Sequence, residues 1–141
     1  MKQRLVALDV GDRRIGVAVS DPLWITAQGV ETYHRTESTK KDVAHILEIL
    51  NRYAPCRLLL GLPMNMNGTV GEQGEKVQRF AEAIRKEWDG ELLFFDERLT
   101  TMAARRVLID ADLSRGKQKK VIDKLAAVLI LQGYMDSHPN G

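Results

Sequence analysis

The chain has 141 residues, of which 44% are hydrophobic and 28% charged, so it is long enough for one domain with a buried core and has the composition of a globular protein. Its formal net charge of +2 indicates no particular partner. A single cysteine, Cys56, excludes an intrachain disulfide, and no apolar stretch reaches the length of a signal peptide or membrane span, which predicts a cytoplasmic protein.

The first half of the chain predicts three strands followed by a helix. Apolar runs and alternation with a period of two mark the strands, and apolar residues at helical spacing mark the helix. The expected strands are Arg4–Val10, Arg14–Ser20 and Gly29–Arg35, and the helix starts at a Ser38 or Thr39 cap and stops before Pro55. Gly11 and Asp12 are turn formers between the first two strands, so these strands should form a hairpin.

The second half of the chain alternates strands with helices. The expected elements are a strand at Arg57–Leu62, a helix through Val77 that ends near Asp89, a strand at Glu91–Phe95, a helix from Thr100 or Thr101 to about Asp110, and a last helix from about Lys119 to Tyr134. A meander followed by this alternation predicts an α/β fold with a five-stranded mixed sheet and helices on both faces. Residues 1–136 should form this single domain, and residues 137–141 a flexible tail.

Acidic residues follow two of the parallel strands, at the sheet edge where open sheets carry their sites. Asp9 lies at the carboxyl end of the first strand, and Asp96 and Glu97 lie at that end of the fifth. Asp123 lies among apolar residues near the start of the last helix. Carboxylates that converge on one point repel each other unless a divalent cation lies between them, and Mg²⁺ or Mn²⁺ prefers such ligands. These acids therefore predict a metal site, which could hold two ions in phosphodiester hydrolysis.

Each acid also has a purely structural explanation. Asp9 could cap the hairpin turn, Glu97 could be a solvated loop residue, and Asp123 could interact with the helix dipole. Asp96 is expected to be the structural member of its pair, bonded to a backbone amide or to Arg98. It is the joint placement of the acids that favours a metal site.

Four motifs occur in order across almost the whole chain: DVGDRRIGVAVSD (9–21), GLPMNMNG (61–68), DERLTT (96–101) and KVIDKLAA (120–127). Together they resemble the bacterial YqgF family, also called RuvX, which is linked to Holliday junction resolvases and to maturation of the 5′ end of 16S ribosomal RNA. The resemblance implies an RNase H-like fold with a divalent-metal nuclease site. It matches Asp9, Glu97 and Asp123 to the family's acids. Many RNase H-like nucleases carry an acid after strand 4, where this chain has Gly61, so Glu97 has to serve instead.

Several further residues are candidates for contact with a nucleic-acid backbone: Gly11, Arg14, Asn65, Gly68, Arg98, Thr100, Thr101, Lys117, Lys119 and Lys120. Gly11 would let the backbone pass close to a metal or phosphate. The basic run before the last acid would make binding salt dependent. Structural alternatives stay open for these residues. Arg14 could brace Asp9, the 61–68 loop could be a plain turn, and Thr100 or Thr101 could cap a helix.

Among the aromatic residues, Trp88 is expected in the core, whereas Trp24 could stack on a base. The three histidines lack metal-ligand spacing, and His45 is expected to be solvated.

The favoured function is a metal-dependent endonuclease that processes the 5′ end of pre-16S rRNA. Its expected partners are RNA and the pre-30S ribosomal particle, and its expected state is a monomer or weak homodimer. One alternative is a Holliday junction resolvase acting on branched DNA, which requires a two-fold dimer. Another is a non-catalytic RNA-binding assembly factor. A sugar kinase or actin-like ATPase also begins with a DxG turn, but it needs a second domain to close over the nucleotide.

Overall fold

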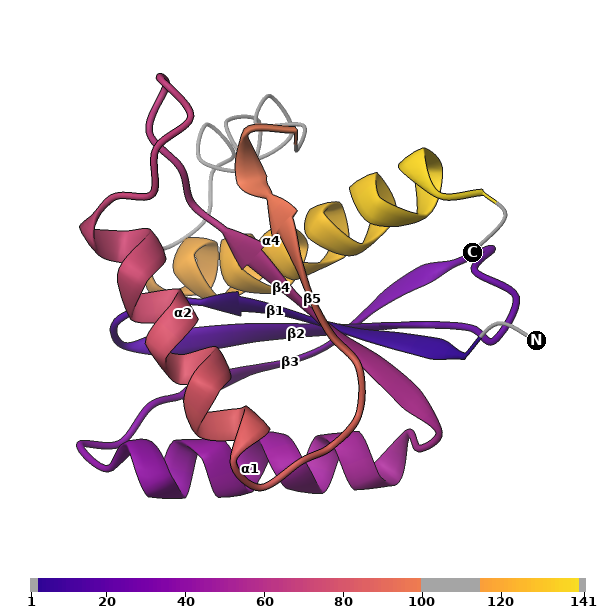
Figure 1. The fold of residues 1–141 in the computed structure, drawn as a ribbon, viewed down its shortest axis with the longest axis horizontal. Helices are drawn as coiled ribbons and strands as arrows, with labels where there is room; N and C mark the ends of the chain where they lie inside the picture. Colours follow the sequence, from indigo (N-terminus) through magenta and orange to yellow (C-terminus); the bar gives the residue numbers. More distant parts are fainter. Residues whose placement is uncertain (1–2, 100–114, 140–141) are drawn as a thin grey trace.

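The computed structural model describes residues 3–99 and 115–139, with the side chains of its last helix described from Lys124 onward. Figure 1 shows the elements in chain order: β1 (Arg4–Val10), β2 (Arg14–Ser20), β3 (Ala27–His34), α1 (Thr39–Arg52), β4 (Cys56–Leu62), α2 (Glu72–Arg85), β5 (Leu92–Asp96), η1 (Glu97–Leu99) and α4 (Arg115–Ser137). The helix predicted after Thr100 lies outside the described residues. No helix in the described part of the chain is long and apolar enough to cross a membrane.

The five strands form one mixed sheet in the order β3-β2-β1-β4-β5. β2 pairs antiparallel with β1 and with β3, whereas β4 lies parallel to β1 and to β5. This confirms the predicted α/β sheet, and β1 and β2 have their predicted bounds. The largest differences are in the helices, because α2 ends at Arg85 instead of near Asp89 and α4 begins at Arg115 instead of near Lys119.

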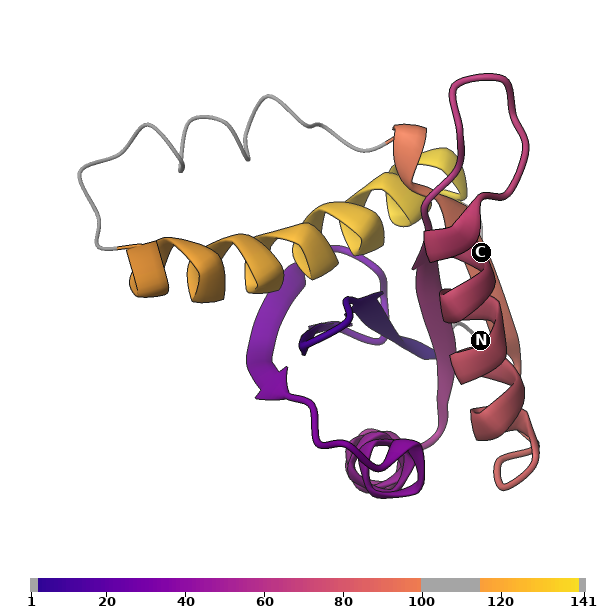
Figure 2. The same ribbon diagram turned by 90° about the vertical axis from the view of Figure 1, so that its left-hand side faces the viewer.

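Two apolar clusters lie on opposite faces of the sheet. Val6 and Leu8 of β1 belong to the cluster that α1 and α2 cover, whereas Leu5 and Ala7 belong to the cluster that α4 covers. Figure 2 shows α1 and α4 on opposite sides of the strands. Since side chains alternate along a strand, Asp9 belongs to the same face as Leu5 and Ala7, which is the α4 face.

Two aromatic side chains differ from expectation. Trp24 is 8% exposed, donates from its Nε1 to the Gln3 carbonyl at 2.6 Å and packs edge-on against a tyrosine of α4, so it is a core residue and does not form a base-stacking surface. The side chain of His45 is 27% exposed because it stacks on Tyr33 and pairs with Glu31 at 3.0 Å, so the expectation that it is solvated was wrong. Trp88 packs against the α1–α2 cluster, as predicted.

The turn between β1 and β2 is tight and braced from outside. The Gly11 amide donates to the Arg14 carbonyl at 2.9 Å, and a Cβ at Gly11 would lie 2.9 Å from the same oxygen, so the turn requires glycine here. Arg35 donates from Nη1 to the Gly11 carbonyl at 3.0 Å. Its Nε also pairs with Asp42 at 3.0 Å, which ties the start of α1 to the turn that follows Asp9.

Asp42 is a fully buried carboxylate with several donors around it. The Tyr33 hydroxyl donates to it at 3.0 Å, and the Thr36 amide and hydroxyl donate at 2.9 and 3.0 Å. Burial acts to raise the pKa of Asp42, but the hydrogen bonds from Thr36, Arg35 and Tyr33 outweigh burial and hold this pKa below its usual value. The ionised form is therefore the one that the fold stabilises.

Replacing Asp42 with alanine should lower the free energy of unfolding by about 3 kcal/mol, because it leaves the half-buried Arg35 without its carboxylate partner. Urea denaturation at neutral pH measures this loss. Glu48→Ala is the matched control, since Glu48 lies on the same helix with its side chain 77% exposed, and it should change stability by less than about 0.5 kcal/mol.

The same variant should also change the pH dependence of stability. A lowered pKa in the folded state gives stability that is present above the unfolded pKa of about 3.9 and is lost as the pH falls through the folded value. The gap between wild type and Asp42→Ala should therefore shrink below about pH 4. A gap that stays constant down to pH 2 would contradict this assignment.

Candidate metal centre at the end of the parallel strands

The carboxyl ends of β1, β4 and β5 meet at one edge of the sheet (Figure 1). The parallel registers pair Leu8 of β1 with Leu60 of β4, and Gly61 of β4 with Phe95 of β5. Continued by one residue, the first register places Asp9 beside Gly61. The first predicted ligand therefore lies on the α4 face, next to the glycine that replaces the acid expected after strand 4.

Glu97 reaches back over β4 to fill the space above Gly61. A Cβ at Gly61 would lie 2.7 Å from Glu97 Oε1 and would overlap Ile130 of α4. Neighbouring strands are about 4.8 Å apart, so the Asp9 backbone lies about one strand spacing from the Gly61 backbone, over which the Glu97 carboxylate is placed. Asp9 and Glu97 are both half-buried. Gly61 thus leaves room for an acid that comes from the next strand.

Asp9 and Glu97 bring carboxylate oxygens to one face, and these are the donors that hard divalent cations prefer. Within the side chains described, no group of three or more His, Cys, Asp or Glu residues could hold a metal ion. The third predicted ligand, Asp123, lies in α4, but its side chain is outside the described part. The donor chemistry of the two described acids fits Mg²⁺ or Mn²⁺, and completing the site requires a third ligand.

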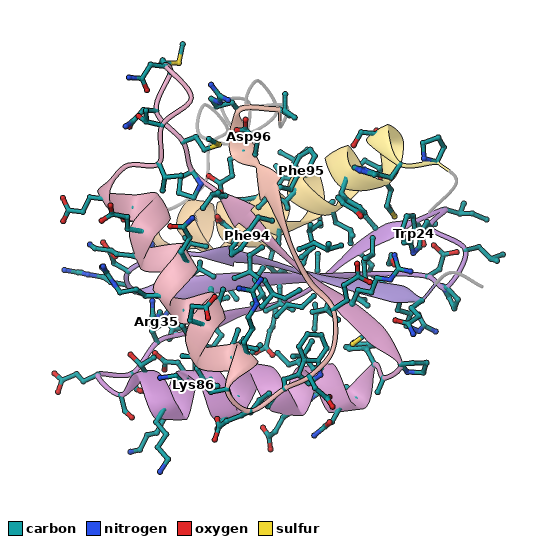
Figure 3. The ribbon with its side chains drawn as sticks, viewed as in Figure 1. Trp24, Arg35, Lys86, Phe94, Phe95 and Asp96 are labelled. Carbon is teal, nitrogen blue, oxygen red and sulfur yellow. The ribbon has the colours of Figure 1, made fainter. Side chains whose placement is uncertain are left out.

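Asp96 takes the structural role that the sequence predicts. It accepts hydrogen bonds from the Arg98 side chain, from Nη2 at 2.7 Å and from Nε at 3.0 Å, and from the Arg98 backbone amide at 2.9 Å. These side-chain hydrogen bonds are the main reason that the pKa of Asp96 lies below its usual value. Figure 3 shows Asp96 at the end of β5, where the pair fixes the turn that contains Glu97.

Arg98 also fastens the 63–70 loop to this edge. Its Nη1 donates to the carbonyls of Asn65 and Met66 at 3.4 and 3.3 Å. Within the loop, the Asn65 side-chain amide donates to the Thr69 hydroxyl at 3.0 Å, and Gly68 has a φ of +86°, which favours glycine. Asn65, Gly68 and Arg98 therefore build a tight turn whose backbone borders the site.

An open groove of about 620 Å³ runs beside Glu97, between the loop and η1. Met66 is 93% exposed at the loop and Leu99 is 67% exposed, and both line this groove. The groove gives a ligand access to Glu97 from solvent.

The structure describes only some of the remaining residues that were predicted to contact nucleic acid. Arg14 is half-buried at the start of β2, and Gly11 is in the turn beside it. Thr100 and Thr101 lie outside the described residues. Lys117, Lys119 and Lys120 belong to α4, with side chains outside the described part.

The packing role of Gly61 was not anticipated from the sequence, and neither was a basic pocket formed by Arg35, Lys76 and Arg79. The only sequence signal for Gly61 is the missing acid after strand 4. The pocket gives no such signal, because its residues come from three segments that are distant in the chain.

A sheet in this order, with α4 across one face, has the RNase H-like fold. The solved structure of T. thermophilus RuvC in complex with a Holliday junction substrate shares this fold, with a TM-score of 0.61 and 17% sequence identity over 99% of this chain and 96% of that one. The family model of RuvX, described as Holliday junction resolvase, matches residues 3–137. The chain belongs to the RuvX family, which confirms the resemblance of its four motifs.

Relatives in this family match along nearly their whole length. A protein of Clostridium novyi is 56% identical over 134 residues, which are 95% of this chain and 98% of the relative. A protein of Thermoanaerobacter pseudethanolicus is 54% identical over 138 residues, or 97% and 99% of the two chains. Both relatives carry the name "Putative pre-16S rRNA nuclease".

Proposed function

We propose that this protein is a divalent-metal-dependent endonuclease that processes the 5′ end of pre-16S rRNA. The observation that carries the proposal is the Glu97 carboxylate seated above Gly61, on the same face as Asp9. Membership of the RuvX family and the name of the relatives support a nuclease. Residues 1–136 would act as one RNase H-like domain.

Asp9, Glu97 and Asp123 are the proposed metal ligands. Asp123 comes one helical turn before Ala127, which is fully buried against the sheet, so helical spacing favours its approach to the same face. Bound Mg²⁺ or Mn²⁺ would supply an activated water and neutralise charge on the leaving oxygen. The fold restrains the two described candidate ligands, since Asp9 lies near the carboxyl end of a buried strand, and Glu97 packs above Gly61 and lies between the paired Asp96 and Arg98.

The proposed contacts to the nucleic-acid backbone surround this edge. The 63–70 loop would present its backbone, including Asn65 and Gly68, and Arg98 would act by holding that loop. The remaining contacts are Gly11, Arg14, Thr100, Thr101, Lys117, Lys119 and Lys120. Phosphate contacts from the basic side chains would make binding salt dependent.

RNA is the favoured substrate and the pre-30S particle the favoured setting, in the cytoplasm, because the relatives carry an rRNA nuclease name. Resolution of a DNA junction is the second candidate, favoured by the family description and by the fold shared with RuvC. A resolvase must cut two strands symmetrically and therefore needs a two-fold dimer. We propose a monomer or weak homodimer.

Cleavage of a 5′-extended 16S rRNA precursor and of a four-way DNA junction, side by side, tests this proposal. Both substrates are incubated with the protein in Mg²⁺, in Mn²⁺ and in chelator. We expect metal-dependent cleavage of the RNA, with 5′-phosphate and 3′-hydroxyl products. Preferential cleavage of the junction would indicate a role in recombination. RNA binding without cleavage of either substrate would indicate a non-catalytic assembly factor.

A further inference from the structure

A second concave site lies on the opposite face of the same sheet edge. It is a pocket of about 310 Å³ between the β1–β2 turn, the start of α1 and the first turns of α2. Its polar side chains are Asp12, Arg35, Thr39, Gln73, Lys76 and Arg79. None of these residues contributes to the proposed metal centre, and the pocket gathers them from segments that are distant in the chain.

The charge of the pocket is mostly positive and partly fixed in place. Arg35 is held by Asp42 behind it and lies over the Phe80 ring at 5.0 Å, so its guanidinium has one position. Lys76 pairs with Asp12 at 3.3 Å, and their side chains are 41% and 61% exposed. Such an exposed pair is weak and opens at little cost.

Arg79 completes the positive wall. It follows Lys76 by three residues on α2, which places both side chains on one side of the helix, and it is exposed. Asp42 is fully buried behind Arg35, so three cations face one solvent-accessible carboxylate, that of Asp12. A pocket of this kind suits a group with negative oxygens.

We propose that this pocket binds a phosphate of the nucleic-acid strand whose scissile bond lies at the metal centre. Gly11 lines the pocket and follows Asp9 by two residues, so the chain passes from the Asp9 backbone to the pocket wall within about 7 Å. A strand that crosses this edge can meet both. The identity of the ligand as a nucleic-acid strand rests on the proposed function, whereas its phosphate chemistry rests on the pocket itself.

Fluorescence anisotropy with a labelled single-stranded RNA from the precursor, in chelator to prevent cleavage, tests the pocket. Lys76→Ala and Arg79→Ala should each weaken binding about fivefold and reduce the salt slope by about 1, as loss of one phosphate contact requires. Asp12→Asn should strengthen binding about twofold, because it removes the carboxylate that competes with the phosphate. Each of these changes is at an exposed or half-exposed side chain, so folding should be retained.

Lys86→Ala is the matched control, with the same loss of one positive charge on the segment that ends α2. Lys86 is ten residues beyond Lys76, or about 15 Å along the helix axis, and should change binding by less than about twofold. Equal losses of RNA affinity in the control and in the pocket variants would show only general charge attraction and would contradict a specific phosphate site in the pocket.

Two further arms separate the other outcomes. Adenosine monophosphate should compete only weakly with the labelled RNA. Competition as strong as that of unlabelled RNA would assign the pocket to a free nucleotide and would contradict its binding of a nucleic-acid strand. Cleavage in Mg²⁺ is measured separately. If the wild type cleaves RNA and the pocket variants bind RNA like the wild type, the phosphate-binding role of the pocket is wrong and the proposed nuclease function is retained. If neither the wild type nor any variant binds RNA, both the phosphate-binding role of the pocket and the proposed action on RNA are wrong.

Discussion

Asp9→Asn is expected to lower the rate of RNA cleavage by about 10³-fold or more while the fold and RNA binding remain. The substitution keeps the size of the side chain at the end of β1 but removes a charged metal ligand. A bound divalent cation contributes several kcal/mol to stabilising the transition state of phosphodiester hydrolysis, which corresponds to a rate factor of this order. Single-turnover cleavage measures the loss, and anisotropy in chelator measures binding.

Asp89→Asn is the control for this prediction, because Asp89 is an exposed carboxylate far from the carboxyl ends of the strands. It should cleave like wild type. Thermal unfolding of both variants checks the fold. Full activity in Asp9→Asn would remove Asp9 from the metal centre, and loss of both activity and folding would assign it a structural role in the hairpin.

Gly61→Ala is expected to impair cleavage by about 100-fold through a residue that has no functional group. The added Cβ would lie 2.7 Å from Glu97 Oε1 and would overlap Ile130, so the Glu97 side chain has to move. A displacement of about 1 Å in a catalytic group can cost 100-fold in rate, and overpacking costs about 1–3 kcal/mol of stability. Cleavage rates and urea denaturation measure the two effects separately.

Gly29→Ala is the matched control on the same face of the sheet. Its Cβ would lie 3.7 Å or more from Lys124 and Val128 of α4, which is ordinary contact. We expect this variant to keep nearly full activity. If Gly61→Ala is as active as Gly29→Ala, the Glu97 carboxylate is not held above β4 for catalysis.

The sheet follows directly from local sequence patterns. β1 and β2 have their predicted bounds because a continuous apolar run, a Gly-Asp turn and a second apolar run are all close together in the chain. The Asp96–Arg98 pair could also be predicted, since its partners are two residues apart. Local chemistry is enough where the interacting groups are neighbours in sequence.

Other parts of the site depend on contacts between distant segments. The seat of Glu97 above Gly61 depends on the β4–β5 register and on the position of α4, neither of which a single motif encodes. The bond from Arg35 to the Gly11 carbonyl joins residues 24 apart. The basic pocket likewise depends on how α2 packs beside the β1–β2 turn.

Trp24 shows how a turn can conceal a core residue. It lies between Leu23 and Ile25, which are 66% and 70% exposed, so the segment reads as a surface loop. The Asp21 carboxylate accepts hydrogen bonds from the backbone amides of Leu23 and Ile25. Trp24 between them adopts a φ of +59°, which turns its ring inward. The burial of one apolar residue between two exposed ones has no periodic signature.

Binding of Mn²⁺ measured by electron paramagnetic resonance tests the metal centre most directly. Titrations compare the wild type with Asp9→Asn, Glu97→Gln and Asp123→Asn, with Asp89→Asn as the control for charge. We predict that each of the three ligand variants binds Mn²⁺ at least about tenfold more weakly than the wild type and the control. Equal affinity in all five proteins would contradict a metal centre built from these acids.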